Sequence, residues 1–273
     1  MDVDGKTVLI TGSTDGLGRA VAWRLANMGA HVLLHGRSRE RGEALRDEIR
    51  AAGKGKADYY HADLASLAEV RNLAKAVLQD NGHIHVLVNN AGLGSGPDVN
   101  RRATSADGHE LRFAVNYLSG FLLTYLLLPT ILKSAPARII NVSSLGQQAI
   151  EFDDVMLERA YDGGRAYRQS KLAQIMFTFD LAEELKGKGV TVNCLHPSTF
   201  MDTTMVRLNN VPPMSTVDQG ADAVMNLIVA DEFGRRSGLY FNVMEESRAN
   251  EQAYDAAARA RLRELSKRLT GLA

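Results

Sequence analysis

Short, continuously apolar runs alternate with amphipathic stretches along the whole chain. The apolar runs do not alternate with polar positions, which is typical of strands covered on both faces by helices. The stretches between them repeat apolar residues three and four positions apart, which predicts helices. We therefore predict strands at 6–11, 31–35, 57–61, 84–89, 137–143, 190–196 and 238–241, and helices at 17–28, 40–52, 66–79, 105–133, 167–186, 221–230 and 250–269.

This repetition of strand and helix predicts an α/β fold of the Rossmann type. Successive βα units with right-handed crossovers build a doubly wound, mostly seven-stranded parallel sheet with helices on both faces. No linker, repeat or low-complexity stretch divides the 273 residues, so we expect a single domain over 1–273. The least regular segment lies near 199–218, is polar and contains Pro212-Pro213, and we expect it to form a lid over a site.

Composition excludes several classes of function. The net charge is 0, so no general field attracts nucleic acid or an anionic membrane. The one cysteine, Cys194, cannot form an internal disulfide, and the N-terminus lacks a signal-peptide pattern, so we expect a cytoplasmic protein without a membrane anchor. The most apolar run, 121–132, is short for a membrane span and contains Pro129. The scattered histidines predict no metal site.

A glycine-rich turn, Thr11-Gly12-Ser13-Thr14-Asp15-Gly16-Leu17-Gly18, follows the first predicted strand and opens the first predicted helix. Small residues there let the backbone approach a pyrophosphate, and the helix N-terminus offers free N–H groups to the anion. This position in an α/β chain predicts a dinucleotide site. The spacing Gly-xxx-Gly-x-Gly is wider in its first gap than the usual Gly-x-Gly-xx-Gly.

The end of the second strand predicts which dinucleotide binds. NAD-binding folds place an acid there for the ribose 2′-hydroxyl, whereas this chain reads Leu34-His35-Gly36-Arg37. The guanidinium of Arg37 can hold a 2′-phosphate, with Arg41 as a second contact and Arg39 as a weaker candidate. We therefore expect NADP rather than NAD.

Two further segments are expected to complete the dinucleotide site. Asp63-Leu64 follows the third strand, where a carboxylate could bind the adenine amino group or act as a plain turn residue. Downstream, Glu69 is predicted to complete a capping box with Ser66. Asn89-Asn90-Ala91-Gly92 follows the fourth strand, where small residues let the backbone pack beside the adenine ribose and the asparagines brace neighbouring turns.

A tyrosine and a lysine, Tyr167 and Lys171, lie four positions apart and therefore on one helix face. A neighbouring ammonium stabilises phenolate and lowers the pKa of tyrosine, which suits the proton transfer that accompanies hydride transfer to a ketone. A hydroxyl of the pair Ser143-Ser144, at the end of the fifth strand, could bind the substrate oxygen. Asn116, in the long fourth helix, could distort that helix and hold a water that feeds protons toward Lys171, or could simply be a satisfied core residue.

These motifs resemble the short-chain dehydrogenase/reductase family over essentially the whole chain. The segments 136–144, 104–110 and 261–266 are similar to its retinol dehydrogenase, WW-domain oxidoreductase and protochlorophyllide reductase branch. The resemblance implies a catalytic tetrad of Asn116, Ser144, Tyr167 and Lys171, with Ser143 as the alternative serine. One departure is Ser198, which stands where the family usually has glycine, in His196-Pro197-Ser198-Thr199.

We therefore expect an NADP(H)-dependent oxidoreductase acting on the carbonyl/alcohol pair of an apolar small molecule. The alternative is an NADPH-binding sensor of the same fold without turnover. The resemblance is also compatible with a homodimer or homotetramer. Candidate contacts to the dinucleotide are Gly12, Ser13, Asp15, Gly16, Leu17, Gly18, Arg37, Arg41, Asp63, Leu64, Asn90, Ala91, Gly92, Tyr167, Lys171, Pro197 and Thr199.

Overall fold

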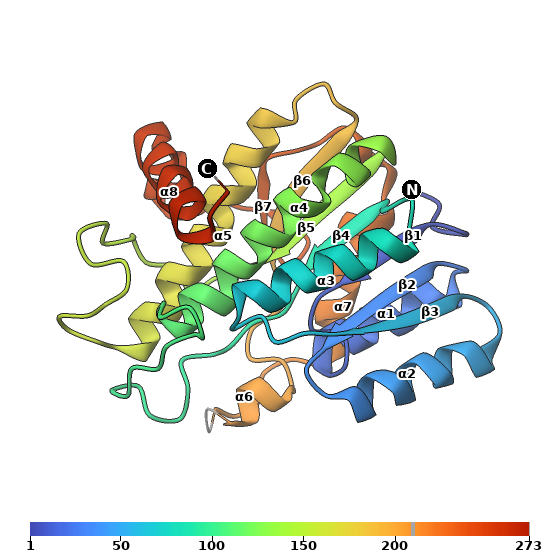
Figure 1. The fold of residues 1–273 in the computed structure, drawn as a ribbon, viewed down its shortest axis with the longest axis horizontal. Helices are drawn as coiled ribbons and strands as arrows, with labels where there is room; N and C mark the ends of the chain where they lie inside the picture. Colours follow the sequence, from blue (N-terminus) through green and yellow to red (C-terminus); the bar gives the residue numbers. More distant parts are fainter. Residues whose placement is uncertain (209–210, 273) are drawn as a thin grey trace.

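A computed structural model describes residues 1–208 and 211–272 of the chain. Its strands form one sheet in the order β3-β2-β1-β4-β5-β6-β7-β8, parallel except for the antiparallel β8 at the edge (Figure 1). The predicted α/β class and parallel sheet are thereby confirmed. The strands are β1 (Thr7–Ile10), β2 (His31–Gly36), β3 (Lys56–His61), β4 (Val86–Asn89), β5 (Ala137–Val142), β6 (Val190–His196), β7 (Leu239–Asn242) and β8 (Glu245–Glu246).

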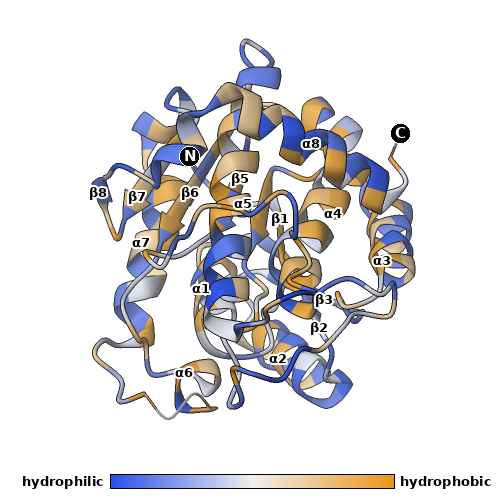
Figure 2. Cartoon of the chain, turned by 90° about the vertical axis from the view of Figure 1, so that its left-hand side faces the viewer, coloured by the Kyte–Doolittle hydropathy of each residue, from blue (hydrophilic) through white to orange (hydrophobic). Residues whose placement is uncertain are grey.

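Helices cover both faces of this sheet. Two apolar clusters fill the space between them, one on each face, because neighbouring strand residues point in opposite directions. Figure 2 shows the hydrophobic residues gathered on the strands and on the inward sides of the helices. The helices are α1 (Gly16–Asn27), α2 (Arg39–Ala52), α3 (Leu67–Asp80), α4 (Ser119–Lys133), α5 (Gly163–Glu184), α6 (Thr204–Leu208), α7 (Val217–Val229) and α8 (Ala256–Thr270).

The fourth long helix begins later than its sequence predicts. Residues 105–110 form a tight turn instead, in which the Ser105 hydroxyl accepts hydrogen bonds from the N–H groups of Asp107 and His109. Gly108 has a φ of 83°, a left-handed value that favours glycine and does not occur within a right-handed helix, so the chain turns here. The helix then opens with a π-helical segment, η1 (Phe113–Leu118), before α4.

The apolar part of the helix made of η1 and α4 extends beyond the run 121–132 that we identified in the sequence. Over Phe113–Lys133 it has the length and composition of a membrane span, but 67% of its most apolar window is buried inside the fold. Its apolar residues pack against α3, α5 and the sheet, so in this structure it is a core helix.

The predicted helix over 250–269 is divided. A 3-10 turn, Glu251–Tyr254, comes first, and α8 then begins after Asp255. The Asp255 side chain accepts hydrogen bonds from the N–H groups of Ala257 and Ala258, which starts a new helix at this point. In Figure 1, α8 lies beside α5, and ion pairs from Arg259 and Arg263 to α5 fix it there.

An aromatic cluster between η1, α4 and α5 provides a test of this packing. Phe121 is 1% exposed, and its ring lies 5.1 Å from that of Phe177. We expect Phe121→Ala to lower the free energy of unfolding by about 3–5 kcal/mol, because it leaves a cavity. Met28→Ala, at a side chain that is 46% exposed, should change the free energy by no more than about 0.5 kcal/mol. Urea denaturation of both variants measures the difference, and equal losses would contradict the assigned core.

Candidate active site

The phosphate-binding turn between β1 and α1 is packed against the end of β4. A Cβ at Gly12, where φ is 66°, would lie 2.9 Å from the Cα of Ala91. A Cβ at Gly18 would lie 2.3 Å from the carbonyl oxygen of Gly12. No side chain fits at either position, so these glycines allow two backbone segments and the first turn of α1 to meet. This is the cradle that the sequence predicts for a pyrophosphate.

Thr11 and Asn90 hold that cradle together. The Thr11 hydroxyl accepts the N–H groups of Asn90 and Ala91 at 3.0 and 3.1 Å. In return, the side-chain amide of Asn90 donates to the carbonyls of Thr11 and Gly12 at 2.9 and 3.2 Å. The side chain of Asn90 therefore braces the turn, as the sequence predicts for this asparagine-rich segment.

Two other predicted contacts in the turn have their side chains engaged within the protein. Ser13 is fully buried, and its hydroxyl accepts the N–H of His35 at 2.9 Å. The Asp15 carboxylate caps α1 at Gly16 and accepts hydrogen bonds from Arg41 at 3.3 Å and from the Thr204 hydroxyl at 2.8 Å. Asp15 thus joins the phosphate-binding turn to α2 and to the lid segment.

The two candidate arginines after β2 differ in their surroundings. Arg37 is exposed and makes no hydrogen bond or ion pair with the described part of the chain, whereas Arg41 is paired with Asp15. Tyr59 supports the corner at the end of β2, since its hydroxyl donates to the carbonyl of Gly36 at 2.7 Å. Of the two arginines, Arg37 is therefore the freer cation.

The segment after β3 is folded by its own carboxylates. Asp63 accepts the N–H of Ala65 at 3.0 Å and donates its own N–H to Glu69 at 2.6 Å. The predicted capping box is therefore only half formed: Ser66 caps α3, but the Glu69 side chain reaches Asp63 rather than Ser66. Leu64 is buried beside this turn. Sequence reasoning placed Glu69 at a helix start and missed its role in shaping this segment.

Tyr167 and Lys171 lie on the same face of α5, with the lysine Nζ 5.8 Å from the centre of the tyrosine ring. Lys171 Nζ donates to the carbonyl of Val142 and to Gln174 Oε1, both at 2.9 Å. Gly92 lies beside this ammonium group, since a Cβ there would be 3.5 Å from Nζ. The pair is thus brought to the segment that follows β4. Gln174 lies three positions after Lys171 on the same helix, a spacing that could have identified it and that sequence reasoning missed.

The structure distinguishes the two serines at the end of β5. The Ser143 hydroxyl donates to the backbone carbonyl of Lys171 at 2.8 Å and so faces into α5. Ser144 lies on the other side, where its hydroxyl acts on Tyr167 and opposes the rise of the phenol's pKa, and its Oγ accepts the N–H of Gly146 at 3.0 Å. Ser144 is therefore the hydroxyl that stands beside the phenol, as expected.

This combination of features corresponds to a known family. A model of the short chain dehydrogenase family matches residues 6–212. The chain belongs to the short-chain dehydrogenase/reductase family. It is therefore an oxidoreductase of the class that uses NAD(P) and acts on small alcohols or carbonyl compounds, which confirms the predicted family and enzyme class.

Named relatives agree with this assignment. The chain is 38% identical to human retinol dehydrogenase 13 over 289 aligned positions, which cover 99% of this chain and 86% of that protein. Among solved structures, an uncharacterized protein of Mycobacterium Paratuberculosis is 28% identical with a TM-score of 0.81, covering 99% of this chain and 96% of the other. The RhlG/NADP active-site complex of Pseudomonas aeruginosa is 29% identical with a TM-score of 0.71, covering 89% and 96%.

In this short-chain dehydrogenase/reductase, Asn116 lies in the π-helical segment η1, so the predicted local distortion of the helix is present. Its side-chain amide donates to the Leu93 carbonyl at 3.0 Å and to the Ser170 hydroxyl at 2.9 Å, and its oxygen accepts the Leu93 N–H at 2.7 Å. Both amide hydrogens are thereby used. Asn116 fastens the segment after Gly92 to the start of α5.

Burial dominates the electrostatics of the pair. It lowers the pKa of Lys171 to about 7, because the charged form loses its hydration. Burial also raises the pKa of Tyr167 above its ordinary value, and the hydrogen bond with Ser144 opposes this only in part. The Tyr167 pKa therefore lies above its ordinary value, and not below it as the sequence predicts.

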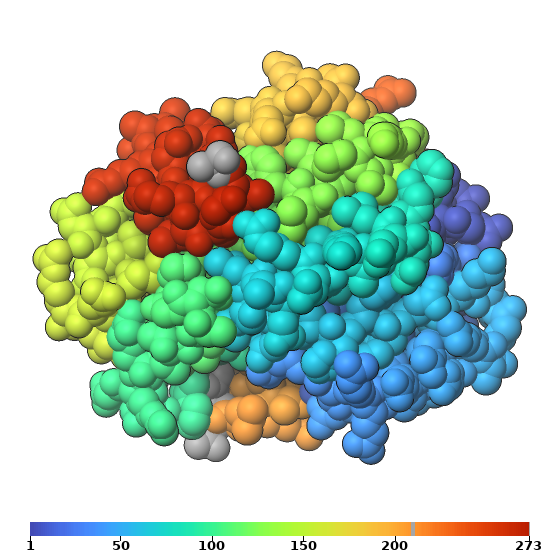
Figure 3. All heavy atoms as spheres, in the orientation of Figure 1, coloured from blue at the N-terminus to red at the C-terminus, as the bar shows by residue number. Residues whose placement is uncertain are grey.

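The loop after β6 accommodates Ser198 without a left-handed backbone conformation, which falls on Phe200 instead, with φ of 44°. Pro197 is buried, and Thr199 is an exposed residue whose hydroxyl is hydrogen-bonded to His196 Nε2 at 3.1 Å. In Figure 3 the orange lid residues lie at the lower edge of the molecule, between the green segment after β4 and the blue α2. Asn209 and Asn210 of the predicted lid lie outside the described residues.

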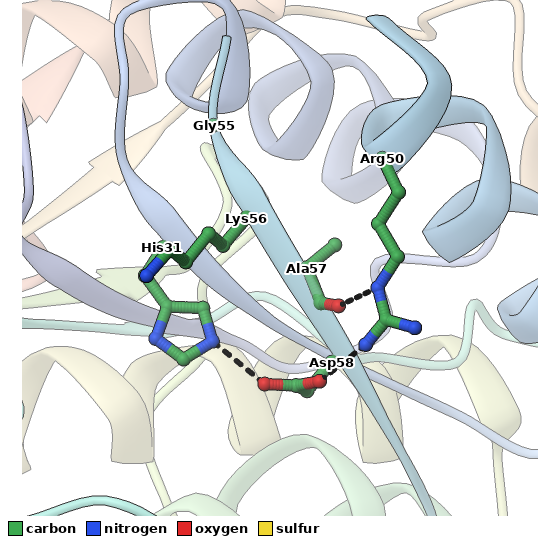
Figure 4. A pocket seen from close by; sticks show the side chains of 6 residues that line it. All are labelled: His31, Arg50, Gly55, Lys56, Ala57 and Asp58. Atoms are coloured by element: carbon green, nitrogen blue, oxygen red, sulfur yellow. Dashed lines mark hydrogen bonds and ion pairs between the residues drawn. The ribbon is translucent and has the colours of Figure 1, made fainter. Parts of the chain in front are cut away.

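A surface hollow of about 410 Å³ lies elsewhere, at the amino ends of β2 and β3 (Figure 4). There Asp58 accepts one hydrogen bond from Arg50 and pairs with His31, each at 2.7 Å. The strands of a parallel sheet present catalytic groups at their carboxyl ends, and this hollow is at the opposite end. We interpret it as an ion-paired edge of the sheet rather than as the active site.

The low pKa of Lys171 predicts a pH dependence of stability. Between about pH 7 and its ordinary value of 10.5, this lysine is neutral in the folded protein and charged in the unfolded chain. The unfolded chain then binds more protons, so the contribution of Lys171 to stability rises with pH through that window. Lys171→Met should remove the rise. Urea denaturation of both proteins at about pH 7 and about pH 10 measures it, and parallel changes in the two proteins would contradict the burial argument.

Proposed function

We propose that the protein catalyses reversible hydride transfer between NADP(H) and the carbonyl/alcohol pair of a small apolar molecule. The observation that carries this proposal is the meeting of Tyr167, Lys171 and Ser144 beside the segment that also closes the phosphate-binding turn. The same carboxyl edge of the sheet thus offers a dinucleotide cradle and a proton donor.

The residues present fit a nicotinamide dinucleotide. The backbone contact between Gly12 and Ala91 leaves a turn free of side chains at the N-terminus of α1, where a pyrophosphate is favoured. Gly92 and Lys171 lie next along the same edge, where the ammonium group would hold the ribose hydroxyls. When bound, the nicotinamide would supply or accept the hydride.

The protein's own groups would handle the proton and the substrate oxygen. The Ser144 hydroxyl would donate a hydrogen bond to that oxygen as negative charge develops on it. Tyr167 would deliver its phenolic proton to the same oxygen, and in the reverse direction it would accept the proton of the alcohol. A bound anionic dinucleotide would favour the charged form of Lys171, which then stabilises phenolate at Tyr167. Asn116 would act by positioning the Leu93 segment and α5.

The preference for NADP rests on the corner at the end of β2. Arg37 is exposed and without a partner among the described residues, so it is free to form charge-assisted hydrogen bonds with a 2′-phosphate. Arg41 is a second candidate that must first leave Asp15. The NADP complex reported for RhlG, a relative in fold and sequence, is consistent with this preference.

An apolar substrate is supported by large side chains that remain exposed near the site. Leu145 follows Ser144 directly and is 54% exposed, and Phe200 in the loop after β6 is 46% exposed. Further along the lid segment, Leu208 and Met214 are also exposed. Retinol dehydrogenase 13 and related retinol dehydrogenases are similar to this chain, so long-chain or isoprenoid alcohols and aldehydes are the first compounds to test.

The alternative function is an NADPH sensor that does not turn over substrate. Such a protein has no need for a phenol held beside a buried ammonium and a serine hydroxyl. The intact arrangement of Ser144, Tyr167 and Lys171 therefore favours the enzyme.

Tyr167→Phe separates these two functions. The substitution removes the proton donor but leaves the phosphate-binding turn intact, so we expect kcat to fall by about 10²–10⁴ while NADPH affinity stays near that of the wild type. NADPH oxidation with a panel of apolar aldehydes and ketones measures kcat, and titration calorimetry measures binding. Wild type and variant that bind NADPH equally and are equally inert would favour the sensor.

Arg37→Ala tests the choice of dinucleotide. Loss of a charge-assisted contact to the 2′-phosphate should weaken NADPH binding by about 10- to 100-fold and leave NADH binding little changed. Arg41→Ala is the matched control, and we expect a smaller effect because Arg41 is paired with Asp15. An Arg37→Ala variant that loses NADPH and NADH affinity to the same extent would refute the assignment.

A further inference from the structure

A buried histidine at the end of β2 lies between the two halves of the dinucleotide site. We propose that His35 is a positioning residue, which fixes the phosphate-binding turn relative to the segment that leads into Asp63. This inference rests on the proposed function. His35 is 2% exposed, so its ring nitrogens have no access to bulk water and depend on partners within the protein.

The two ring nitrogens bind one segment each. The N–H of Gly12, in the phosphate-binding turn, donates to Nδ1 at 3.1 Å. On the other side of the ring, Nε2 lies 3.2 Å from the carbonyl oxygen of Ala62, the residue before Asp63. A backbone N–H can only donate and a carbonyl can only accept, so Nδ1 must be unprotonated and Nε2 must carry the hydrogen. Only the neutral ring in this tautomer makes both bonds.

The backbone of His35 adds to this connection. Its N–H donates to the Ser13 hydroxyl at 2.9 Å, and its carbonyl accepts the Ser13 N–H, also at 2.9 Å. His35 therefore binds Gly12 through its ring and Ser13 through its backbone, whereas it binds Ala62 through its ring alone. The ring is thus the part of His35 that connects the residue after β3 to the phosphate-binding turn.

The surroundings keep the ring neutral. Burial lowers the pKa of His35 to about 4, which outweighs the opposing effect of the hydrogen bond to Ala62. Among the charged groups that face it, His61 and Arg37 disfavour protonation and Asp63 favours it. The acceptor at Nδ1 is thus present throughout the neutral pH range.

Loss of the ring would act on binding more than on chemistry. Without it, the Gly12 N–H and the Ala62 carbonyl lose their partner, and only the pairing of β1, β2 and β3 and the Ser13–His35 bonds still relate the two segments, so their positions become less well fixed. A dinucleotide that spans both would then have to order them, which lowers its affinity. Tyr167, Lys171 and Ser144 lie on α5 and after β5, away from this connection. Turnover with saturating NADPH should therefore persist.

The test is His35→Leu, with NADPH affinity measured by titration calorimetry and kcat measured at saturating NADPH. We expect the Kd for NADPH to rise at least about tenfold, with kcat within about twofold of wild type. His85→Leu is the matched control, because His85 Nδ1 also accepts a backbone N–H, that of Thr7 at 3.1 Å, but at the amino end of the sheet. His85→Leu should lower thermal stability and leave the Kd unchanged.

Two conservative variants keep the test decisive where leucine prevents folding. His35→Asn keeps an acceptor near the position of Nδ1, and His35→Gln keeps a donor near the position of Nε2. Each variant therefore retains one of the two bonds and should raise the Kd for NADPH less than His35→Leu does. A folded His35→Leu protein with wild-type Kd, or one whose kcat falls while its Kd is unchanged, would overturn the inference. A wild type that binds neither NADPH nor NADH would overturn the proposed function itself.

Nuclear magnetic resonance of the histidine rings gives a readout independent of binding. We expect His35 to show the neutral Nε2–H tautomer without titrating between about pH 5 and about pH 8. Titration of this ring near its ordinary pKa of 6.5 would show that Nδ1 is not an obligatory acceptor, and would overturn the proposal.

Discussion

The close approach of backbone to backbone at the carboxyl ends of β1 and β4 is the constraint on which the site depends. Gly12 contacts Ala91 at a distance that excludes any Cβ, and Gly18 contacts Gly12 in the same way. Because β4 is held there, the residues after it, Gly92 and Leu93, are brought to Lys171 and Asn116. The turn that receives phosphate and the groups that move a proton are therefore parts of one packed arrangement.

Burial then determines the chemistry that this arrangement can perform. Lys171 is held by a backbone carbonyl and a glutamine oxygen, neither of which carries a full charge to offset its lost hydration. Burial lowers its pKa to about 7 and raises that of Tyr167, so it opposes charge on both groups. An anionic dinucleotide bound beside Lys171 would shift the lysine further toward its charged form.

Much of this could be predicted from local sequence. Continuous apolar runs predicted the parallel strands, and the spacing of Gly12, Gly16 and Gly18 predicted the phosphate-binding turn, because both depend on neighbouring residues. The predicted start of the fourth long helix, at residue 105, was wrong, because Ser105 and Gly108 stabilise a turn over 105–110. Contacts between distant segments were not predictable: Lys171 on the Val142 carbonyl and Tyr59 on the Gly36 carbonyl carry no periodic signal. Gln174 is three positions from Lys171 on one helix, and Glu69 is six positions from Asp63, so these two contacts lay within local reach and were nevertheless missed.

The groups that brace the site are mostly uncharged, and this has a physical reason. Thr11, Asn90 and Asn116 hold backbone through neutral hydrogen bonds, as the neutral ring of His35 does. Neutral braces fix geometry without adding a net charge near a phosphate or a developing alkoxide, whereas a carboxylate beside Lys171 or Arg37 would compete with the ligand for the cation. Charged braces also occur: the carboxylates of Asp63 and Glu69 fold the segment after β3, and Asp15 pairs with Arg41 while leaving Arg37 unpaired within the described chain. The Arg37 guanidinium therefore remains available to a ligand.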